Sequence, residues 1–237
     1  MIEIRTGMAL AAGLGTRMRP LTNDRPKALV EVGGKALLDW AIDRFEAAGV
    51  EKIVINVHHF ADAMEAHIRA HPSADRLIVS DERECVLETG GGVVKALPLL
   101  GTDPVFVSNI DAVWVDAGEC ELDRMRAAWD AGRMDVLLLL APMQATLGFD
   151  GPGDFFLAEN GQVEWRGEAE RAPYAYAGVH ILNPAILAGR SATRFSMVDV
   201  WRELVPTGRV CGLAMESFWM HAGDPQAVAD AEARLPA

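Results

Sequence analysis

Short apolar runs of strand length alternate, along the first half of the chain, with segments that carry apolar residues at helical spacing. The runs are nearly uninterrupted by polar residues, as in strands that are buried on both faces. Residues 36–48 instead place their apolar side chains on one helix face, and Gly49 follows as a stop signal. The pattern predicts strands at 7–11, 52–57, 76–80, 104–108 and 135–140, and helices at 36–48, 61–70, 92–100 and 122–131.

The pattern changes after about residue 148. Residues 154–158 and 162–165 flank Asn160-Gly161, a dipeptide typical of a β-hairpin turn. Further elements are predicted as strands at 174–182 and 209–215 and helices at 196–204 and 224–234.

Alternating buried strands and crossover helices predict an α/β fold, with a Rossmann-like, doubly wound, mostly parallel sheet and helices on both faces. We expect one domain over 1–237, with the main sheet at about 1–147 and a small β/α lobe with a closing helix at about 148–237. Ligands of such sheets bind beyond the carboxyl ends of the strands. The loops after Ala11, Ser80 and Ser108 are therefore the predicted site.

Charge and cysteine content narrow the possible partners. The 34 acidic and 22 basic residues give a net charge of −12, which repels nucleic-acid backbones and anionic membranes, so we expect neither as a partner. The three cysteines form no CxxC pair, which favours a reducing cytoplasm over a disulfide framework. The apolar start runs directly into a glycine-rich turn, and this predicts a strand instead of a signal peptide.

A group of small and basic residues follows the first predicted strand, reading LAAGLGTRMRP from Leu10 to Pro20. Its two glycines, Gly13 and Gly15, let backbone amides wrap phosphate oxygens. Arg17 can hold the β- and γ-phosphates of an NTP in a forked geometry. The ordinary alternative is a strand-to-helix turn with solvated cations, and neither GxxxxGK[ST] nor GxGxxG is present.

Two further features of this stretch suit a nucleotide. Ala11 and Ala12 are small enough for a flat base to lie against the backbone. Lys27 supplies a point charge suited to a phosphate whose charge develops during transfer. The joint pattern LAAGLGTRMRPLT…PKALV resembles the signature of the sugar-1-phosphate nucleotidylyltransferase family, which has a GT-A-like nucleotidyltransferase fold. The resemblance implies nucleotide binding by Ala11, Ala12, Gly13, Gly15, Thr16 and Arg17.

The segment Leu87-Glu88-Thr89-Gly90-Gly91-Gly92 resembles the base-recognition segment of that family, in the form seen in bacterial N-acetylmuramate-1-phosphate uridylyltransferases of peptidoglycan recycling. A glycine run that opens a helix offers free amide donors to a base or an anion, although it is also an ordinary flexible helix start. The resemblance implies nucleotide contacts from Glu88, Thr89 and Gly90.

Asp111 follows the predicted strand 104–108, at the position where the family holds its catalytic Mg²⁺, with Mn²⁺ as an alternative. The family commonly has Gly-Asp here, and this chain has Ile110-Asp111. An aspartate after a strand is otherwise a frequent cap or turn former. Asn109 is a candidate to hydrogen-bond the substrate or to support the loop.

Two residues of the second lobe resemble sugar-side positions of the family. Asp154, in Gly153-Asp154-Phe155, is expected to meet the sugar. Gly178 is expected to let the sugar phosphate approach the strand backbone. A turn aspartate and a packing glycine are the ordinary interpretations of these two positions.

The chain departs from the family near its end. Relatives have Trp-x-Asp-x-Gly-Thr, with the Asp as second metal ligand, whereas this chain has His221 at that position. His221 either ligates a softer metal such as Mn²⁺, or hydrogen-bonds a phosphate or a metal-bound water, or takes no part.

The resemblance implies transfer of a nucleoside monophosphate from UTP to N-acetylmuramate 1-phosphate, with release of pyrophosphate. The catalytic residues would be Arg17, Lys27 and Asp111, acting by positioning and charge neutralisation. A mannose- or heptose-1-phosphate guanylyltransferase and a non-catalytic nucleotide-sugar sensor are the alternatives.

Overall fold

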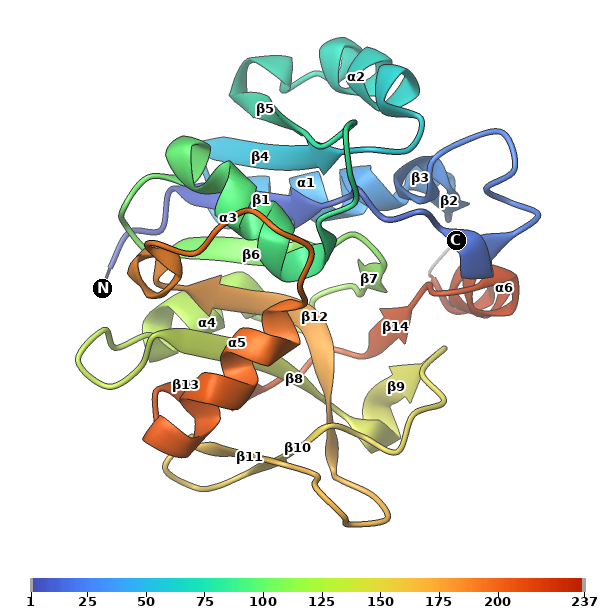
Figure 1. The fold of residues 1–237 in the computed structure, drawn as a ribbon. Helices are drawn as coiled ribbons and strands as arrows, with labels where there is room; N and C mark the ends of the chain where they lie inside the picture. Colours follow the sequence, from blue (N-terminus) through green and yellow to red (C-terminus); the bar gives the residue numbers. More distant parts are fainter. Residues whose placement is uncertain (1, 236–237) are drawn as a thin grey trace.

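One mixed nine-stranded sheet runs through the protein, and the computed structural model describes residues 2–235 (Figure 1). The strands follow the order β11-β10-β12-β6-β1-β4-β5, and β8 pairs with both β12 and β13. Their bounds are β1 Thr6–Leu10, β4 Lys52–Val57, β5 Leu77–Asp81, β6 Val105–Asn109, β8 Val136–Pro142, β10 Phe155–Leu157, β11 Val163–Trp165, β12 Tyr174–Leu182 and β13 Val210–Ala214.

Helices cover both faces of this sheet, with α3 and α5 in front and α1 and α4 behind in Figure 1. The helices are α1 Leu37–Ala47, α2 Ala61–Ala70, α3 Glu88–Leu100, α4 Glu121–Ala128, α5 Met197–Leu204 and α6 Pro225–Arg234. Five short strands lie outside the main sheet: β2 Glu31–Val32, β3 Lys35–Ala36, β7 Ala112–Val113, β9 Thr146–Leu147 and β14 Trp219–His221.

Successive strand residues enter different cores, which explains the continuous apolar runs. Met8 packs in the core under α3 and α5, while its neighbour Ala9 packs in the core of the opposite face. Ile53 and Val54 of β4 divide in the same way. The predicted α/β fold with helices on both faces is therefore confirmed.

Parallel pairing dominates only the first half of the chain. β1 pairs in parallel with β4 and β6, and β4 with β5. The long strand β12 lies antiparallel to both β6 and β8, so the segments after residue 148 extend the main sheet. The β10–β11 hairpin lies at the far end, around the predicted Asn160-Gly161 turn.

Helix α3 begins earlier than its apolar pattern predicts. It starts at Glu88 instead of residue 92, so the three glycines lie inside its first turns. The short strands β7, β9 and β14 are likewise absent from the sequence prediction, because two or three residues carry no recognisable period.

No helix among residues 2–235 has both the length and the apolar character needed to cross a membrane.

A buried histidine on β12 gives the fold a pH dependence. His180 is 1% exposed, and the Tyr176 hydroxyl hydrogen-bonds its Nδ1 at 2.7 Å. Burial lowers the pKa of His180 to about 3, so the folded protein holds it neutral. The unfolded chain takes up this proton below a pKa of about 6.5. The contribution of the neutral His180 to the free energy of unfolding is therefore fully present above pH 6.5 and is lost progressively as the pH falls from 6.5 towards 3.

We expect the free energy of unfolding attributable to His180 to drop by about 2 kcal/mol between pH 7 and pH 5. Urea unfolding of the wild type and of His180→Gln at both pH values measures it, because glutamine keeps a hydrogen-bonding group but does not titrate. An equal pH-dependent loss in both proteins would show that His180 is not the source.

Candidate active site

A pocket of about 390 Å³ opens beyond the carboxyl ends of the central strands, at the predicted place. Strands β1 and β6 are neighbours, with Leu10 opposite Asn109, so the loops that follow them lie side by side. The loop after β5 supplies Val86, and the first turn of α3 supplies Glu88 and Thr89. The predicted site residues that line the pocket are Ala11, Ala12, Gly13, Gly15, Thr16, Arg17, Lys27, Glu88, Thr89, Asn109 and Asp111.

The glycine loop lines this pocket with residues whose backbone amides are unpaired. Among the described residues, the N–H groups of residues 13–17 have no hydrogen-bond acceptor. Gly15 adopts φ +63°, and a Cβ there would lie 3.0 Å from the Cβ of Lys27 and 3.1 Å from the Cγ2 of Thr22. The Thr22 hydroxyl donates to the Gly15 carbonyl at 2.8 Å and fixes the turn. Consecutive free amides of this kind form an anion-binding concavity.

Two basic side chains lie near these amides, one exposed and the other largely buried and paired with a carboxylate. Arg17 is exposed and forms no ion pair with any carboxylate of residues 2–235. The ammonium of Lys27 lies 2.6 Å from Oδ2 of Asp111, and the two side chains are 12% and 16% exposed. Burial alone would raise the pKa of Asp111, but the charges of Lys27 and His221 outweigh it and hold that pKa well below its usual value.

His221 also contacts Asp111. Its Nε2 lies 3.3 Å from Oδ2 of Asp111, and its Nδ1 lies 3.1 Å from the carbonyl oxygen of Gly148. A carbonyl only accepts, so Nδ1 carries a proton, and Nε2 needs a second proton to bond the carboxylate. Burial would lower the pKa of His221, but the contact with Asp111 and the Gly148 carbonyl raise it above its ordinary value.

The backbone brings His221 to this place. Strand β14 pairs antiparallel with β7, with His221 opposite Ala112, and the Ala222 N–H donates to the Asp111 carbonyl at 2.8 Å. A chain segment that starts more than 100 residues after Asp111 thus closes the site from one side.

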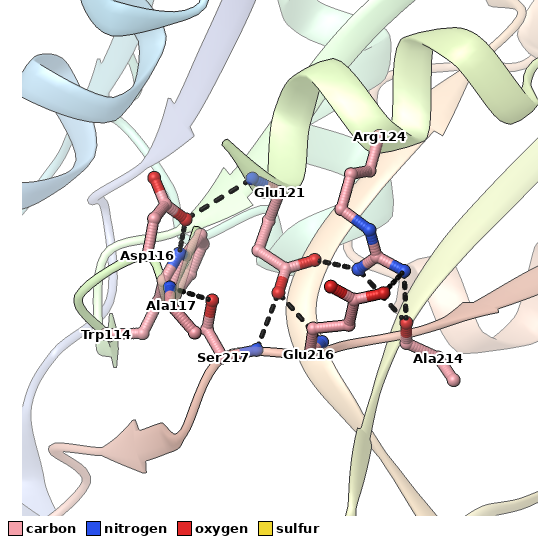
Figure 2. A network of polar contacts seen from close by, with 8 residues as sticks. All are labelled: Trp114, Asp116, Ala117, Glu121, Arg124, Ala214, Glu216 and Ser217. Carbon is pink, nitrogen blue, oxygen red and sulfur yellow. Dashed lines mark hydrogen bonds and ion pairs between the residues drawn. The ribbon is translucent and has the colours of Figure 1, made fainter. Parts of the chain in front are cut away.

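A buried carboxylate fixes the chain just before β14 (Figure 2). Glu121, at the start of α4, is fully buried and accepts the N–H groups of Glu216 and Ser217 at 2.8 and 2.7 Å. Arg124 pairs with Glu121 and donates to the Ala214 carbonyl. A buried carboxylate with this many donors is satisfied, and it anchors the segment that leads to His221.

The donor set suits a cation that brings most of its own ligands. No group of three or more His, Cys, Asp or Glu side chains within residues 2–235 could enclose a metal ion. Both contacts to Asp111 are made to Oδ2, which leaves Oδ1 for another ligand. Mg²⁺ commonly binds through one or two carboxylates plus substrate phosphates and waters, and Asp111 fits that role.

The glycine run differs from its predicted role. The N–H groups of Gly90 and Gly91 both donate to the Phe195 carbonyl, at 3.0 and 3.2 Å, and Gly90 is buried and does not line the pocket. A Cβ on Gly90 would lie 2.2 Å from the Phe195 ring, and one on Gly91 would lie 1.9 Å from the carbonyl oxygen of Thr193. These glycines permit close packing against residues 193–195, so the Gly90 amide is not free for a base.

The two predicted sugar-side residues lie outside the pocket wall. Asp154 accepts the Tyr176 N–H at 2.9 Å, and burial raises its pKa. Gly178 adopts φ +84°, and a Cβ there would lie 3.0 Å from the Cβ of Ala112 and 3.4 Å from that of Asn109. Gly178 therefore lies directly beside the loop that carries Asp111.

The sequence interpretation missed one polar side chain of the pocket. Asn56 lines the pocket at the end of β4, yet it is only 2% exposed. Its signal was its polarity within the otherwise apolar part of the run 52–57. A buried amide in such a strand needs polar partners, and here these are the Ala11 and Ala12 N–H groups and Glu82.

Comparison with known proteins agrees with this geometry. Residues 7–147 match the family model of the MobA-like NTP transferase domain. The chain is 55% identical over 234 residues to N-acetylmuramate alpha-1-phosphate uridylyltransferase of Caulobacter vibrioides, covering 98% of this chain and 97% of the relative. It is 30% identical over 229 residues to the protein of the same name from Neisseria meningitidis serogroup B, covering 95% and 96%.

A solved structure of UDP-glucose pyrophosphorylase from Acinetobacter baumannii is similar with a TM-score of 0.79 at 18% identity, covering 97% of this chain and 92% of that chain. At this identity the likeness supports the fold. Together with the family match over more than half of the chain, these findings confirm the resemblance seen in the glycine loop: the chain belongs to the sugar-1-phosphate nucleotidyltransferase family.

Proposed function

We propose that this protein transfers UMP from UTP to N-acetylmuramate 1-phosphate, and that it acts in the cytoplasm in peptidoglycan recycling. The observation that carries the reaction type is the pocket whose wall contains both the unbonded amides of residues 13–17 and the Lys27–Asp111 pair. The choice of substrates rests on the 55% identical relative named for them.

The reaction is a single in-line displacement. An oxygen of the sugar phosphate attacks the α-phosphorus of UTP, a new phosphorus–oxygen bond forms, and the bond to the bridging oxygen breaks to release pyrophosphate. The attacking oxygen is already ionised at neutral pH, so no strong general base is needed. Catalysis is then a matter of alignment and of stabilising the negative charge that develops.

Each residue has a part in this reaction. The amides of residues 13–17 and the exposed Arg17 hold the β- and γ-phosphates, which leave as pyrophosphate. Lys27 stabilises charge at the reacting phosphate, and Asp111 keeps its ammonium in place. Asp111 would also hold a divalent ion, which would neutralise phosphate charge. His221 keeps Asp111 oriented through its own bond to Oδ2.

A panel of substrates tests the proposal. We expect pyrophosphate release to be fastest for UTP with N-acetylmuramate 1-phosphate, measured against the other three NTPs and against mannose, heptose and glucose 1-phosphates, with Mg²⁺ and Mn²⁺ side by side. A preference for GTP with a mannose or heptose phosphate would replace the proposed substrates. Tight nucleotide binding without pyrophosphate release under either metal would indicate a sensor.

A further inference from the structure

A pair of buried polar side chains supports the wall of the pocket behind Ala11 and Ala12. Asn56 ends β4 and Glu82 follows β5, and they are 2% and 1% exposed. The mechanism above uses neither of them. A carboxylate buried this deeply needs partners, and its partner here is the amide side chain of Asn56.

The hydrogen bonds of Asn56 run in one direction. Its Oδ1 accepts the N–H of Ala11 at 2.6 Å and the N–H of Ala12 at 3.3 Å. A backbone N–H group can only donate, so the oxygen of the carboxamide must face these two N–H groups and the nitrogen must face the other way. There Nδ2 donates to Oε1 of Glu82 at 2.8 Å. Glu82 thus fixes which end of Asn56 meets the loop.

The surroundings hold Glu82 and make room for the pair. The Glu82 N–H donates to the Val57 carbonyl at 2.8 Å, and Nδ1 of His58 lies 2.7 Å from the Glu82 carbonyl oxygen. A Cβ on Gly92 would lie 2.9 Å from Oε1 of Glu82 and 3.0 Å from Nδ2 of Asn56. The third glycine of the run therefore leaves space for this hydrogen bond.

The hydrogen bonds to Asn56 determine which backbone amide of the glycine loop is the first one left free for a nucleotide. The Ala11 and Ala12 amides bond to Asn56, and the first unbonded amide is that of Gly13, which begins the row of unbonded amides in the pocket wall. Two fixed peptide planes directly before that row set the direction of the amides that follow. We infer that Asn56 and Glu82 are positioning residues that set the glycine loop for nucleotide binding. The inference rests on the proposed function only in that this loop holds the nucleotide.

Asn56→Asp is the informative variant. Its carboxylate still accepts from Ala11 and Ala12, but its second oxygen then meets Oε1 of Glu82, and the two carboxylates must share a proton. Lys95 on α3 and His58 after β4 are the charged or titratable groups near Glu82. As the pH rises and the shared proton leaves, the two charges repel and the loop loses its support. Nucleotide affinity of this variant should therefore fall with rising pH.

We expect the affinity of Asn56→Asp for Mg²⁺–UTP, measured by calorimetry without sugar phosphate, to be close to wild type at pH 6 and weaker by about tenfold at pH 8, corresponding to a coupling of about one pKa unit. The wild type, titrated at the same pH values, corrects for the ionisation of UTP itself. Asn160→Asp, in the exposed hairpin turn, adds the same charge away from the pocket and should behave as wild type.

The double variant Asn56→Asp/Glu82→Gln reverses donor and acceptor. The new carboxamide at position 82 donates to the new carboxylate at position 56, which restores the support of the loop without a proton to lose. Affinity should therefore recover at pH 8, and the extra pH dependence should disappear. This rescue separates positioning from a merely steric role of the two side chains.

Three results would overturn the inference. The first is an affinity of Asn56→Asp that follows that of the wild type at every pH, and the second is no recovery of affinity in the double variant. The third is a changed order of preference among the four NTPs in Glu82→Gln, which would mean that Glu82 contacts the base directly. If UTP does not bind the wild type, the NTP that it binds best serves as the probe. A failure of the proposed substrates therefore stays distinguishable from a failure of this inference.

Discussion

Alanine in place of Lys27 is expected to lower turnover by about 10²–10³-fold, the usual effect of removing one group that stabilises developing charge. The Lys27 ammonium lies 2.6 Å from Asp111, in the wall of the pocket that also contains the glycine loop proposed to hold the triphosphate. Without it the pocket wall keeps the exposed Arg17 but loses the largely buried cation beside Asp111. The fold should persist, because Asp111 keeps its contact with His221 at 3.3 Å.

The measurement is kcat from pyrophosphate release, with the thermal midpoint recorded for each variant. Lys35→Ala is the matched control, since Lys35 also pairs with an aspartate, Asp43, at 2.5 Å, but on an exposed part of the surface. It should change kcat by less than about twofold, as an exposed pair contributes little. A Lys27→Ala enzyme with wild-type kcat would remove Lys27 from the mechanism.

Gly91→Ala is expected to destabilise the protein by about 1–3 kcal/mol, the usual cost of forcing an extra carbon into a packed site. Helix propensity by itself predicts the reverse, since alanine within a helix is favoured over glycine by about 1 kcal/mol. The structure decides the sign: a Cβ on Gly91 would lie 1.9 Å from the backbone oxygen of Thr193, and a backbone oxygen cannot rotate away as a side chain does.

Urea unfolding at pH 7 measures this loss. Gly118→Ala is the control, because a Cβ at Gly118 meets no atom within 4 Å and its backbone is not left-handed. A Gly91→Ala protein as stable as wild type would mean that residues 193–195 do not pack closely on α3.

Nucleotide affinity should weaken in the same variant, because Arg194 pairs with Glu88 and the Met197 N–H donates to Thr89, and both Glu88 and Thr89 lie in the pocket wall.

The sequence by itself determined the central strands and most of the site. Strand β4 and helix α2 have the predicted bounds, because a run buried on both faces and a one-sided apolar stripe are local patterns. The carboxyl ends of parallel strands share one edge of a sheet, so the order of elements alone brought the loops that carry Gly13 and Asp111 together.

Only the tertiary structure decided what the glycine run and the late histidine do. Positions 90 and 91 require glycine because Phe195 and Thr193 pack where a Cβ would lie. Position 92 requires glycine because the Asn56–Glu82 hydrogen bond occupies the space beside it. None of these partners is adjacent in the sequence, and a glycine that permits packing looks the same in a sequence as one that frees an amide. His221 reaches Asp111 through a three-residue strand held by a buried glutamate, and so short a pairing leaves no period along the chain.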